Sequence, residues 1–301
     1  MGRALFAASF RKGDIVHNTF SYHLTPAGHM MEAGAHACGC IVIPAGIGNT
    51  EQQIEAITQL KPSKYVGTPS FLRILLEKAE SLGVDISSIT HGAVGGEALP
   101  PSLRDYFTER DVVVLQAYGT ADIGLIAYES DAIEGMIVDE EIILEIVRPG
   151  TGQPLPVGEV GEVVVTSLNP YYPLIRFATG DLSALLPGGS PCGRTNTRIK
   201  GWMGRADQTT KVKGMFVHPK QIAQVVERHA EISRARLVVD NQNHVDLMTL
   251  HCEVNRATEG LADAISASLQ TICKVKGGVI VEKPGSLKND GKIIDDIRTY
   301  D

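Results

Sequence analysis

The chain of 301 residues is 43% hydrophobic and 21% charged, which is typical of a soluble globular protein with one large domain, or with a large domain and a smaller companion. Its formal net charge is −7 and its Lys and Arg residues are dispersed, so no nucleic-acid partner is expected. No apolar run approaches the roughly 18 residues that a membrane-spanning helix needs, so no membrane partner is expected either.

The five cysteines are few for this length and odd in number, which argues against a disulfide framework and favours a reducing, cytoplasmic compartment. Cys38 and Cys40 have no second Cys or His pair at zinc-ligand spacing, and Cys192 stands alone in the segment SPCGRT. Residues 1–14 contain a short apolar run but no cleavage site, so they do not predict a signal peptide. We interpret the cysteines as structural or incidental and the protein as cytoplasmic.

Strand-like and helix-like patterns alternate from about residue 36 to 118. The expected strands are 38–44, 64–69, 90–94 and 111–119, and the expected helices are 50–60, 68–83 and a segment that starts at a proline and runs to about residue 110. Thr50 and Thr68 are the expected N-caps of the first two helices. This alternation predicts a parallel sheet with helices on its faces, and ligands bind at the carboxyl ends of such strands. The loops that start at residues 95 and 118 are therefore candidate site loops.

The hydrophobic period changes to two after about residue 136. The segments 140–149 and 158–168 predict an antiparallel hairpin, because each is strand-like and Pro- and Gly-rich residues separate them. The last hundred residues or so predict two short strands, a helix at 219–230, two strands, a helix at 260–273 and a final strand. We therefore divide the chain into an α/β subdomain (1–135), a β subdomain (136–204) and a small α+β C-terminal domain (205–301).

Four short motifs occur in a particular order: YGTADIG (118–124), LIRFATGDL (174–182), GWMGRADQTTKVKG (201–214) and PGSLKNDGKIID (284–295). Each alone arises easily by chance, but together they resemble the core motifs of the adenylate-forming ligase superfamily. NTFSYHLTPAG (18–28), GCIVIPAGIGNT (39–50), GTPSFL (67–72) and CGRT (192–195) resemble its phenylacetate–coenzyme A ligase-like branch. The resemblance implies that ATP activates a carboxylic acid to an acyl-adenylate, whose acyl group then passes to the thiol of coenzyme A.

The resemblance also implies a nucleotide site. Asp181 matches the acid that binds both ribose hydroxyls. A carboxylate suits this role because it can accept two hydrogen bonds from a diol. Gly95, Gly96 and Glu97 match the loop that lies along the adenine, and Tyr118 matches the aromatic residue that stacks on it. A simple turn remains the alternative interpretation of Asp181 and of the glycine-rich loop.

The motif YGTADIG (118–124) also implies phosphate and metal contacts. Gly119 and Thr120 would place backbone amides near the α-phosphate. Asp122 matches the position of a Mg²⁺ ligand where the family usually has Glu, and its carboxylate remains a suitable ligand for a hard cation. Ala121 stands where relatives often carry a hydroxyl that touches phosphate, so this chain departs from the pattern there.

The C-terminal motifs imply a domain that rotates between the two half-reactions. Arg205 matches a nucleotide contact and Asp207 matches the hinge residue. Lys211, Lys213 and Gly214 match the segment beside coenzyme A, although a charged β-hairpin explains them as well.

Lys292, which follows Gly291, matches the adenylation lysine, whose ammonium bridges carboxylate and α-phosphate oxygens. Phe20, Tyr22 and His23 fall in the segment that lines the acyl pocket of the family, where an aromatic acid would stack. Core packing explains Phe20 and Tyr22 almost as well. The sequence is compatible with a homodimer.

The phosphate-binding loop of the superfamily, rich in Ser, Thr and Gly with a Lys, has no counterpart in these 301 residues. We interpret the sequence as that of a ligase lacking a substantial N-terminal part, and we expect this chain alone to form acyl-adenylate poorly. Two alternatives stay open. One is an adenylate-forming ligase with another acceptor, and the other is a non-catalytic protein that binds nucleotide.

Overall fold

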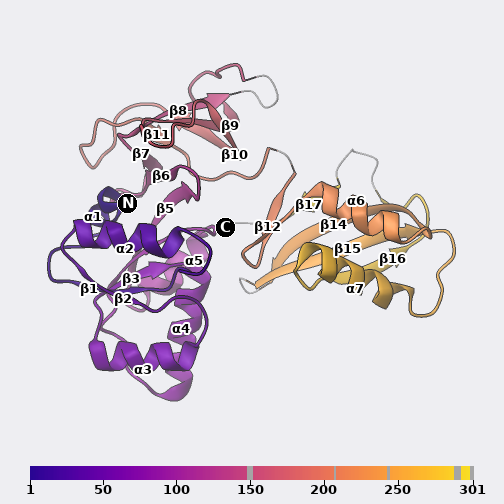
Figure 1. Cartoon of the computed structure of the whole chain (residues 1–301), viewed down its shortest axis with the longest axis horizontal. Helices are drawn as coiled ribbons and strands as arrows, with labels where there is room; N and C mark the ends of the chain where they lie inside the picture. Colours follow the sequence, from indigo (N-terminus) through magenta and orange to yellow (C-terminus); the bar gives the residue numbers. More distant parts are fainter. Residues whose placement is uncertain (148–151, 207, 243–244, 288–292, 299–301) are drawn as a thin grey trace. The chain divides into compact units, whose positions relative to one another are not determined.

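The computed structural model describes the chain except for residues 148–151, 207, 243–244, 288–292 and 299–301 (Figure 1). Asp207 and Lys292, the predicted hinge residue and adenylation lysine, therefore lie outside the described residues. The chain forms two compact units, Met1–Met203 and Gly204–Tyr300, which we call the large and the small unit. Among the described residues, no helix is both long enough and apolar enough to cross a membrane.

The first part of the large unit is a parallel sheet with helices on both faces (Figure 1). Its elements are α1 (Gly2–Ala7), β1 (Ile15–Asn18), α2 (Ala27–Ala37), β2 (Ile41–Pro44), α3 (Thr50–Leu60), β3 (Lys64–Gly67), α4 (Pro69–Leu82), β4 (His91–Val94), α5 (Pro101–Thr108) and β5 (Val113–Thr120). Neighbouring residues of β3 belong to different hydrophobic clusters. Tyr65 packs with residues of α3, α4 and α5, whereas Val66 packs with residues of α1 and α2. This alternation follows from the period of two along a strand.

The sheet continues beyond β5 in antiparallel pairing. The added strands are β6 (Gly124–Tyr128), β7 (Met136–Val138), β8 (Ile142–Val147), β9 (Val160–Ser167), β10 (Phe177–Leu186) and β11 (Arg198–Ile199). The order of all eleven strands is β2-β1-β3-β4-β5-β6-β7-β11-β10-β9-β8. β5 joins the two halves, because it pairs parallel with β4 and antiparallel with β6. The strands before and after residue 136, where the sequence pattern changes, therefore belong to one hydrogen-bonded sheet.

The capping residues of α3 and α4 fix where these helices begin and end. α4 begins as predicted: the Thr68 hydroxyl accepts a hydrogen bond from the Phe71 amide at 3.3 Å, and Gly83 ends the helix with φ 65°. The predicted N-cap of α3 was wrong by one residue. Asn49, with φ 48°, is the N-cap there, and Thr50 is the first helical residue.

The small unit has its own core between two helices and a four-stranded sheet. Its elements are β12 (Thr210–Val212), β13 (Met215–Val217), α6 (Pro219–Arg228), β14 (Ile232–Gln242), β15 (Val245–Val254), α7 (Leu261–Cys273), β16 (Gly278–Glu282) and β17 (Ile294–Asp296). The sheet order is β16-β15-β14-β17, and β12 and β13 form a separate hairpin. The predicted fold class is confirmed. The sequence pattern did not predict β17, which pairs parallel with β14.

Candidate active site

The loop after β4 lies against β5 so closely that it requires glycine. A Cβ atom at Gly95 would stand 2.7 Å from the carbonyl oxygen of Ala117, and Gly96 has φ 77°. The Gly95 amide donates to the Gly67 carbonyl at 3.1 Å, and the Gln116 side-chain amide donates to the Glu97 carbonyl at 3.1 Å. The backbone of this predicted adenine loop is therefore fixed to its neighbouring strands.

Asp181 and Tyr118, both predicted nucleotide residues, meet across the large unit. The Tyr118 hydroxyl donates to Asp181 Oδ2 at 2.8 Å, although the two residues are 63 positions apart. The indole nitrogen of Trp202 donates to Asp181 Oδ1 at 3.0 Å. Asp181 is largely buried, with 8% of its surface exposed. The structure thus brings two motif residues together and adds a third, Trp202, to which the motifs gave no role.

An irregularity in β10 sets the direction of Asp181. The pairing register of β9 and β10 shifts between Ala178 and Leu182, and Gly180 within this stretch has φ 72°. The Thr179 hydroxyl donates to the Val163 carbonyl at 2.9 Å and accepts from the Asp181 amide at 3.1 Å. β-Bulges often occur beside functional sites because they redirect a side chain. The tripeptide TGD therefore has a structural reason as well as a predicted role.

The end of β5 and the turn that follows it hold the predicted phosphate and metal residues. A Cβ atom at Gly119 would stand 2.4 Å from the Gly124 carbonyl oxygen, so the hairpin closes tightly there. The Thr120 hydroxyl accepts a hydrogen bond from the Ile123 amide at 3.1 Å, and Asp122 is exposed on the turn. Within the described part of the chain, no three His, Cys, Asp or Glu side chains converge as a metal site. A single carboxylate nevertheless fits Mg²⁺, which often takes its other ligands from water and substrate phosphates.

A partly buried ion pair, Arg104 with Glu129, contacts the backbone of β5. The Arg104 guanidinium donates to both Glu129 oxygens, at 2.8 and 2.9 Å, and to the Val114 carbonyl at 2.6 Å. Glu129 also accepts from the Gln116 amide at 2.7 Å. These contacts tie α5, β5 and the residue after β6 together. Sequence reasoning missed this network, since neither charged residue belongs to a motif.

The predicted acyl-pocket residues differ in their surroundings. Tyr22 is half-buried, accepts a hydrogen bond from the Asn18 amide at 2.6 Å and packs edge-on against His29 with ring centres 5.0 Å apart. Burial, together with Glu32, raises the pKa of Tyr22 to about 12. Phe20 packs against the core beside α1 and α2, whereas His23 is exposed.

In the small unit, two predicted cationic residues lie near one aromatic ring. The Arg205 guanidinium lies 5.7 Å and the Lys211 ammonium 5.5 Å from the ring centre of Phe216. Lys213 and Gly214 form the two-residue turn between β12 and β13, with φ 49° and 82°, as a type I′ turn requires. The charged hairpin expected as the alternative is therefore present, and coenzyme A contacts for these residues stay a prediction.

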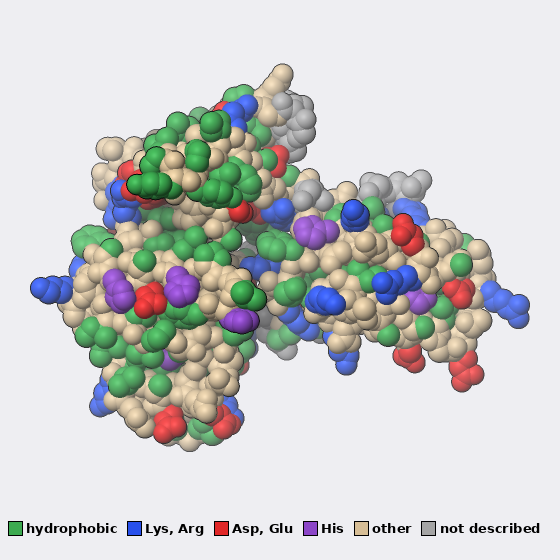
Figure 2. All heavy atoms as spheres, viewed as in Figure 1, with side chains coloured by type: hydrophobic (Ala, Val, Ile, Leu, Met, Phe, Trp, Pro, Cys, Tyr) green, Lys and Arg blue, Asp and Glu red, His purple; other side chains and the backbone are tan. Residues whose placement is uncertain are grey.

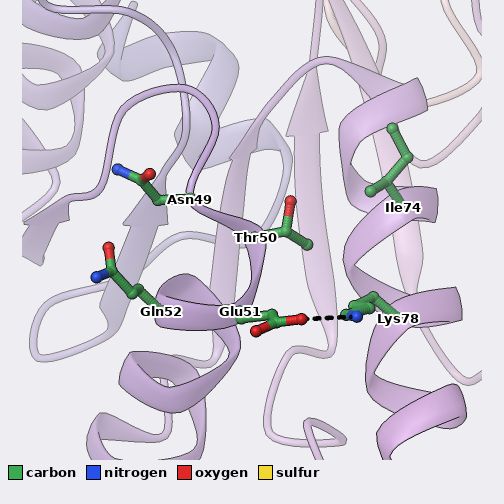
Figure 3. Close-up of a pocket in the computed structure, with 6 residues that line it drawn as sticks. All are labelled: Asn49, Thr50, Glu51, Gln52, Ile74 and Lys78. Carbon is green, nitrogen blue, oxygen red and sulfur yellow. Dashed lines mark ion pairs between the residues drawn. The ribbon is translucent and has the colours of Figure 1, made fainter.

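A pocket of about 570 Å³ opens between the start of α3 and the middle of α4 (Figure 3). Glu51 and Lys78 form an ion pair in it at 2.8 Å. The pocket is lined by Asn49, Thr50, Glu51, Gln52, Ile74 and Lys78, and none of the predicted site residues that the structure describes is among them.

Comparison with known proteins decides the family. The model of the AMP-binding enzyme family matches residues 5–170. The chain belongs to the AMP-binding enzyme family. A phenylacetate–coenzyme A ligase of Pseudomonas putida is 30% identical over 97% of this chain and 70% of its own length. That of Thermus thermophilus is 31% identical over 85% of this chain and 59% of its length, and that of Aromatoleum evansii is 29% identical over 96% and 69%. The resemblance to phenylacetate–coenzyme A ligases, which are adenylate-forming acid–thiol ligases, is thus confirmed.

Solved structures show the same fold. A 2-hydroxyisobutyryl-CoA ligase in complex with 2-HIB-AMP and CoA superposes with a TM-score of 0.83 at 23% identity, and it matches 99% of this chain and 68% of its own. An amide bond synthetase from Marinactinospora thermotolerans gives a TM-score of 0.70 at 18% identity, over 97% of this chain and 62% of its own. The chain therefore spans about three fifths to seven tenths of the length of the relatives named here.

Proposed function

We propose that this AMP-binding family member carries out the two-step chemistry of an acid–coenzyme A ligase. In the first step a carboxylate oxygen attacks the α-phosphorus of ATP and pyrophosphate leaves. In the second step the coenzyme A sulfur attacks the acyl carbonyl and AMP leaves. The observation that carries the proposal is the match to phenylacetate–coenzyme A ligases over 85–97% of this chain.

The geometry of the large unit supports a nucleotide role for its motif residues. Asp181 binds the ribose, Tyr118 borders the adenine, and the amides of Gly119 and Thr120 approach the α-phosphate. Asp122 contributes a carboxylate to Mg²⁺, which neutralises phosphate charge when bound. These roles draw support from the contact between Tyr118 and Asp181 and from the tight turn after β5.

The remaining roles rest on the motifs. Lys292 supplies a positive charge between the carboxylate and the α-phosphate, and Arg205 contacts the nucleotide. Asp207 is the hinge of a mobile small unit, while Lys211, Lys213 and Gly214 border coenzyme A. The acid is aromatic, in keeping with the names of the relatives and with Phe20, Tyr22 and His23 in the predicted pocket segment.

The decisive experiment separates the first step from the second. The purified 301-residue chain is incubated with ATP, Mg²⁺ and phenylacetate, and hydroxylamine traps any acyl-adenylate as a hydroxamate. We expect slow hydroxamate formation, and a thioester when coenzyme A replaces hydroxylamine. Hydroxamate without thioester would indicate another acceptor. AMP binding without hydroxamate would indicate a non-catalytic nucleotide-binding protein.

Variants assign the residues in the same assay. Because Asp181→Asn removes the charge that strengthens hydrogen bonds to the ribose, we expect AMP affinity to fall about tenfold. Lys292→Ala should abolish hydroxamate formation while AMP affinity changes little. Wild-type AMP affinity in Asp181→Asn would contradict the ribose assignment.

A homodimer and a cytoplasmic location are further proposals. Ile143 on the edge strand β8 and the neighbouring Leu168 and Ile175 are 54%, 58% and 79% exposed, and Figure 2 shows apolar side chains gathered over this part of the large unit. Apolar surface of this kind is often buried between subunits. Light scattering would measure the mass in solution, and cell fractionation would test the location.

A further inference from the structure

Trp202 is the one tryptophan of the chain, and its indole is placed beside the predicted ribose acid. The indole nitrogen donates to Asp181 Oδ1 at 3.0 Å, while the Tyr118 hydroxyl donates to Oδ2 at 2.8 Å. Each carboxylate oxygen is therefore held by a donor from a different segment of the chain. The terminal torsion of an aspartate is soft, so two donors on opposite oxygens restrict the plane of the carboxylate.

The backbone around Trp202 is itself fixed to β10. The Met203 amide donates to the Leu182 carbonyl at 2.9 Å. On the other side, the buried Ser183 hydroxyl donates to the Gly201 carbonyl at 2.7 Å. These two bonds join the residues flanking Trp202 to the two residues that follow Asp181. The indole is thus presented to the carboxylate by a segment with little freedom to move away.

We propose that Trp202 is a positioning residue for nucleotide recognition: its N–H sets the orientation in which Asp181 accepts the two hydroxyls of the ribose. The proposal rests on the ribose role of Asp181 proposed above. It assigns specificity for ribonucleotides to a residue outside the TGD motif. Trp202 touches the carboxylate and acts on the nucleotide through it.

A cycle of two proteins and two ligands tests this role. Calorimetry measures the affinity of the wild-type chain and of Trp202→Phe for AMP and for 2′,3′-dideoxyadenosine monophosphate, which lacks both hydroxyls. Trp202→Phe keeps an aromatic ring but removes the N–H donor. We expect AMP affinity to fall about five- to twentyfold, less than the full effect of one hydrogen bond to a charged group because Trp202 acts through Asp181, with dideoxy-AMP affinity unchanged.

Each outcome of the cycle has a meaning. Equal losses for both ligands would show that Trp202 acts through packing, and unchanged affinities would show that it does not act at all; either result overturns the proposal. If the wild-type chain binds AMP no better than dideoxy-AMP, the ribose role of Asp181 fails first. Tyr171→Phe, at a side chain 95% exposed, is the control and should match the wild type for both ligands.

A second measurement needs no variant, so it stands even if Trp202→Phe fails to fold. Because the chain has one tryptophan, its fluorescence reports this position alone. Saturating AMP should shift the emission, whereas saturating dideoxy-AMP should leave it close to that of the free chain. The same shift with both ligands would overturn the proposal.

Discussion

His17 is a buried histidine whose protonation state follows from its neighbours. Its Nε2 atom lies 2.8 Å from Gln53 Oε1, and the Gln53 amide nitrogen donates to the carbonyls of Gly46 and Gly48 at 2.9 and 2.7 Å. Gln53 Oε1 must therefore accept, so Nε2 of His17 carries the hydrogen. The histidine has no exposed surface, and burial lowers its pKa more than the bond to Gln53 raises it. The folded protein thus keeps a neutral imidazole.

This neutral imidazole makes stability depend on pH. The pKa of His17 is lower in the folded than in the unfolded chain, so the stabilisation is present above pH 6.5, its ordinary pKa. It is lost as the pH falls from there towards the lowered pKa, because the unfolded chain then binds the extra proton. Between about pH 7 and 5, the free energy of unfolding in urea should rise with pH more steeply in the wild type than in His17→Gln, by at most about 1.4 kcal/mol per pH unit, the limit for one proton. His36→Gln, at an exposed site, should keep the slope; equal slopes in all three proteins would refute the role of His17.

Cys192 should be the reactive thiol of this chain. Partial burial raises the pKa of its thiol, but hydrogen bonds from Ser130, Ser190 and Arg194 outweigh it and bring the pKa to about 6. Burial instead raises the pKa of Cys40, Cys252 and Cys273 to about 11. Since the thiolate is the nucleophile, limiting iodoacetamide at about neutral pH should alkylate Cys192 first. Peptide mass spectrometry checks this order, and Arg194→Ala should slow the reaction; uniform labelling would contradict it.

At the scale of the element, α3 and α4 offer a matched test of capping. Thr68 caps α4 through its hydroxyl, whereas Thr50 lies inside α3 and makes no cap bond. Thr68→Ala should therefore lower the free energy of unfolding by about 1 kcal/mol, and Thr50→Ala should change it by less than about half of that. Urea denaturation followed by circular dichroism measures both. Equal effects at the two sites would mean that the capping bond is not the cause.

Elements with a regular period could be predicted from the sequence, and pairings between distant strands could not. The helix at α4 carries its own start and stop residues, so Thr68 and Gly83 predict its bounds. β7 and β11 have only three and two residues and pair across about sixty positions, so no local pattern reveals them. These two strands join β6 to β10, so the continuity of the eleven-stranded sheet depends on them.

The candidate site divides in the same way. Tyr118 and Asp181 could be found because their motifs are local. Trp202 and the ion pair of Arg104 with Glu129 could not, because their partners are set by the approach of segments far apart in sequence. An indole that leaves water usually finds an acceptor for its N–H, and this rule could have drawn attention to Trp202, the one tryptophan of the chain.

At the scale of the whole molecule, the two units have separate hydrophobic cores. The core of the small unit includes Leu250 and Ile265, and no described residue of the large unit belongs to it. Separate cores favour independent unfolding. Scanning calorimetry should therefore show two transitions, with the larger enthalpy for the large unit, because unfolding enthalpy grows with the number of residues. A single transition with equal calorimetric and van't Hoff enthalpies would contradict this expectation.

The hydrogen bond between the Met203 amide and the Leu182 carbonyl fixes the point from which the small unit's first residues extend. Met203 is the last residue of the large unit and is held beside the strand that carries Asp181. Two trans peptide units extend at most about 7 Å, so the backbone of Arg205 stays within that distance of Met203 in every orientation of the small unit. Residues farther along, such as Lys211, have a longer tether. Covalent geometry alone thus keeps the backbone of Arg205 close to Met203, the last residue of the large unit.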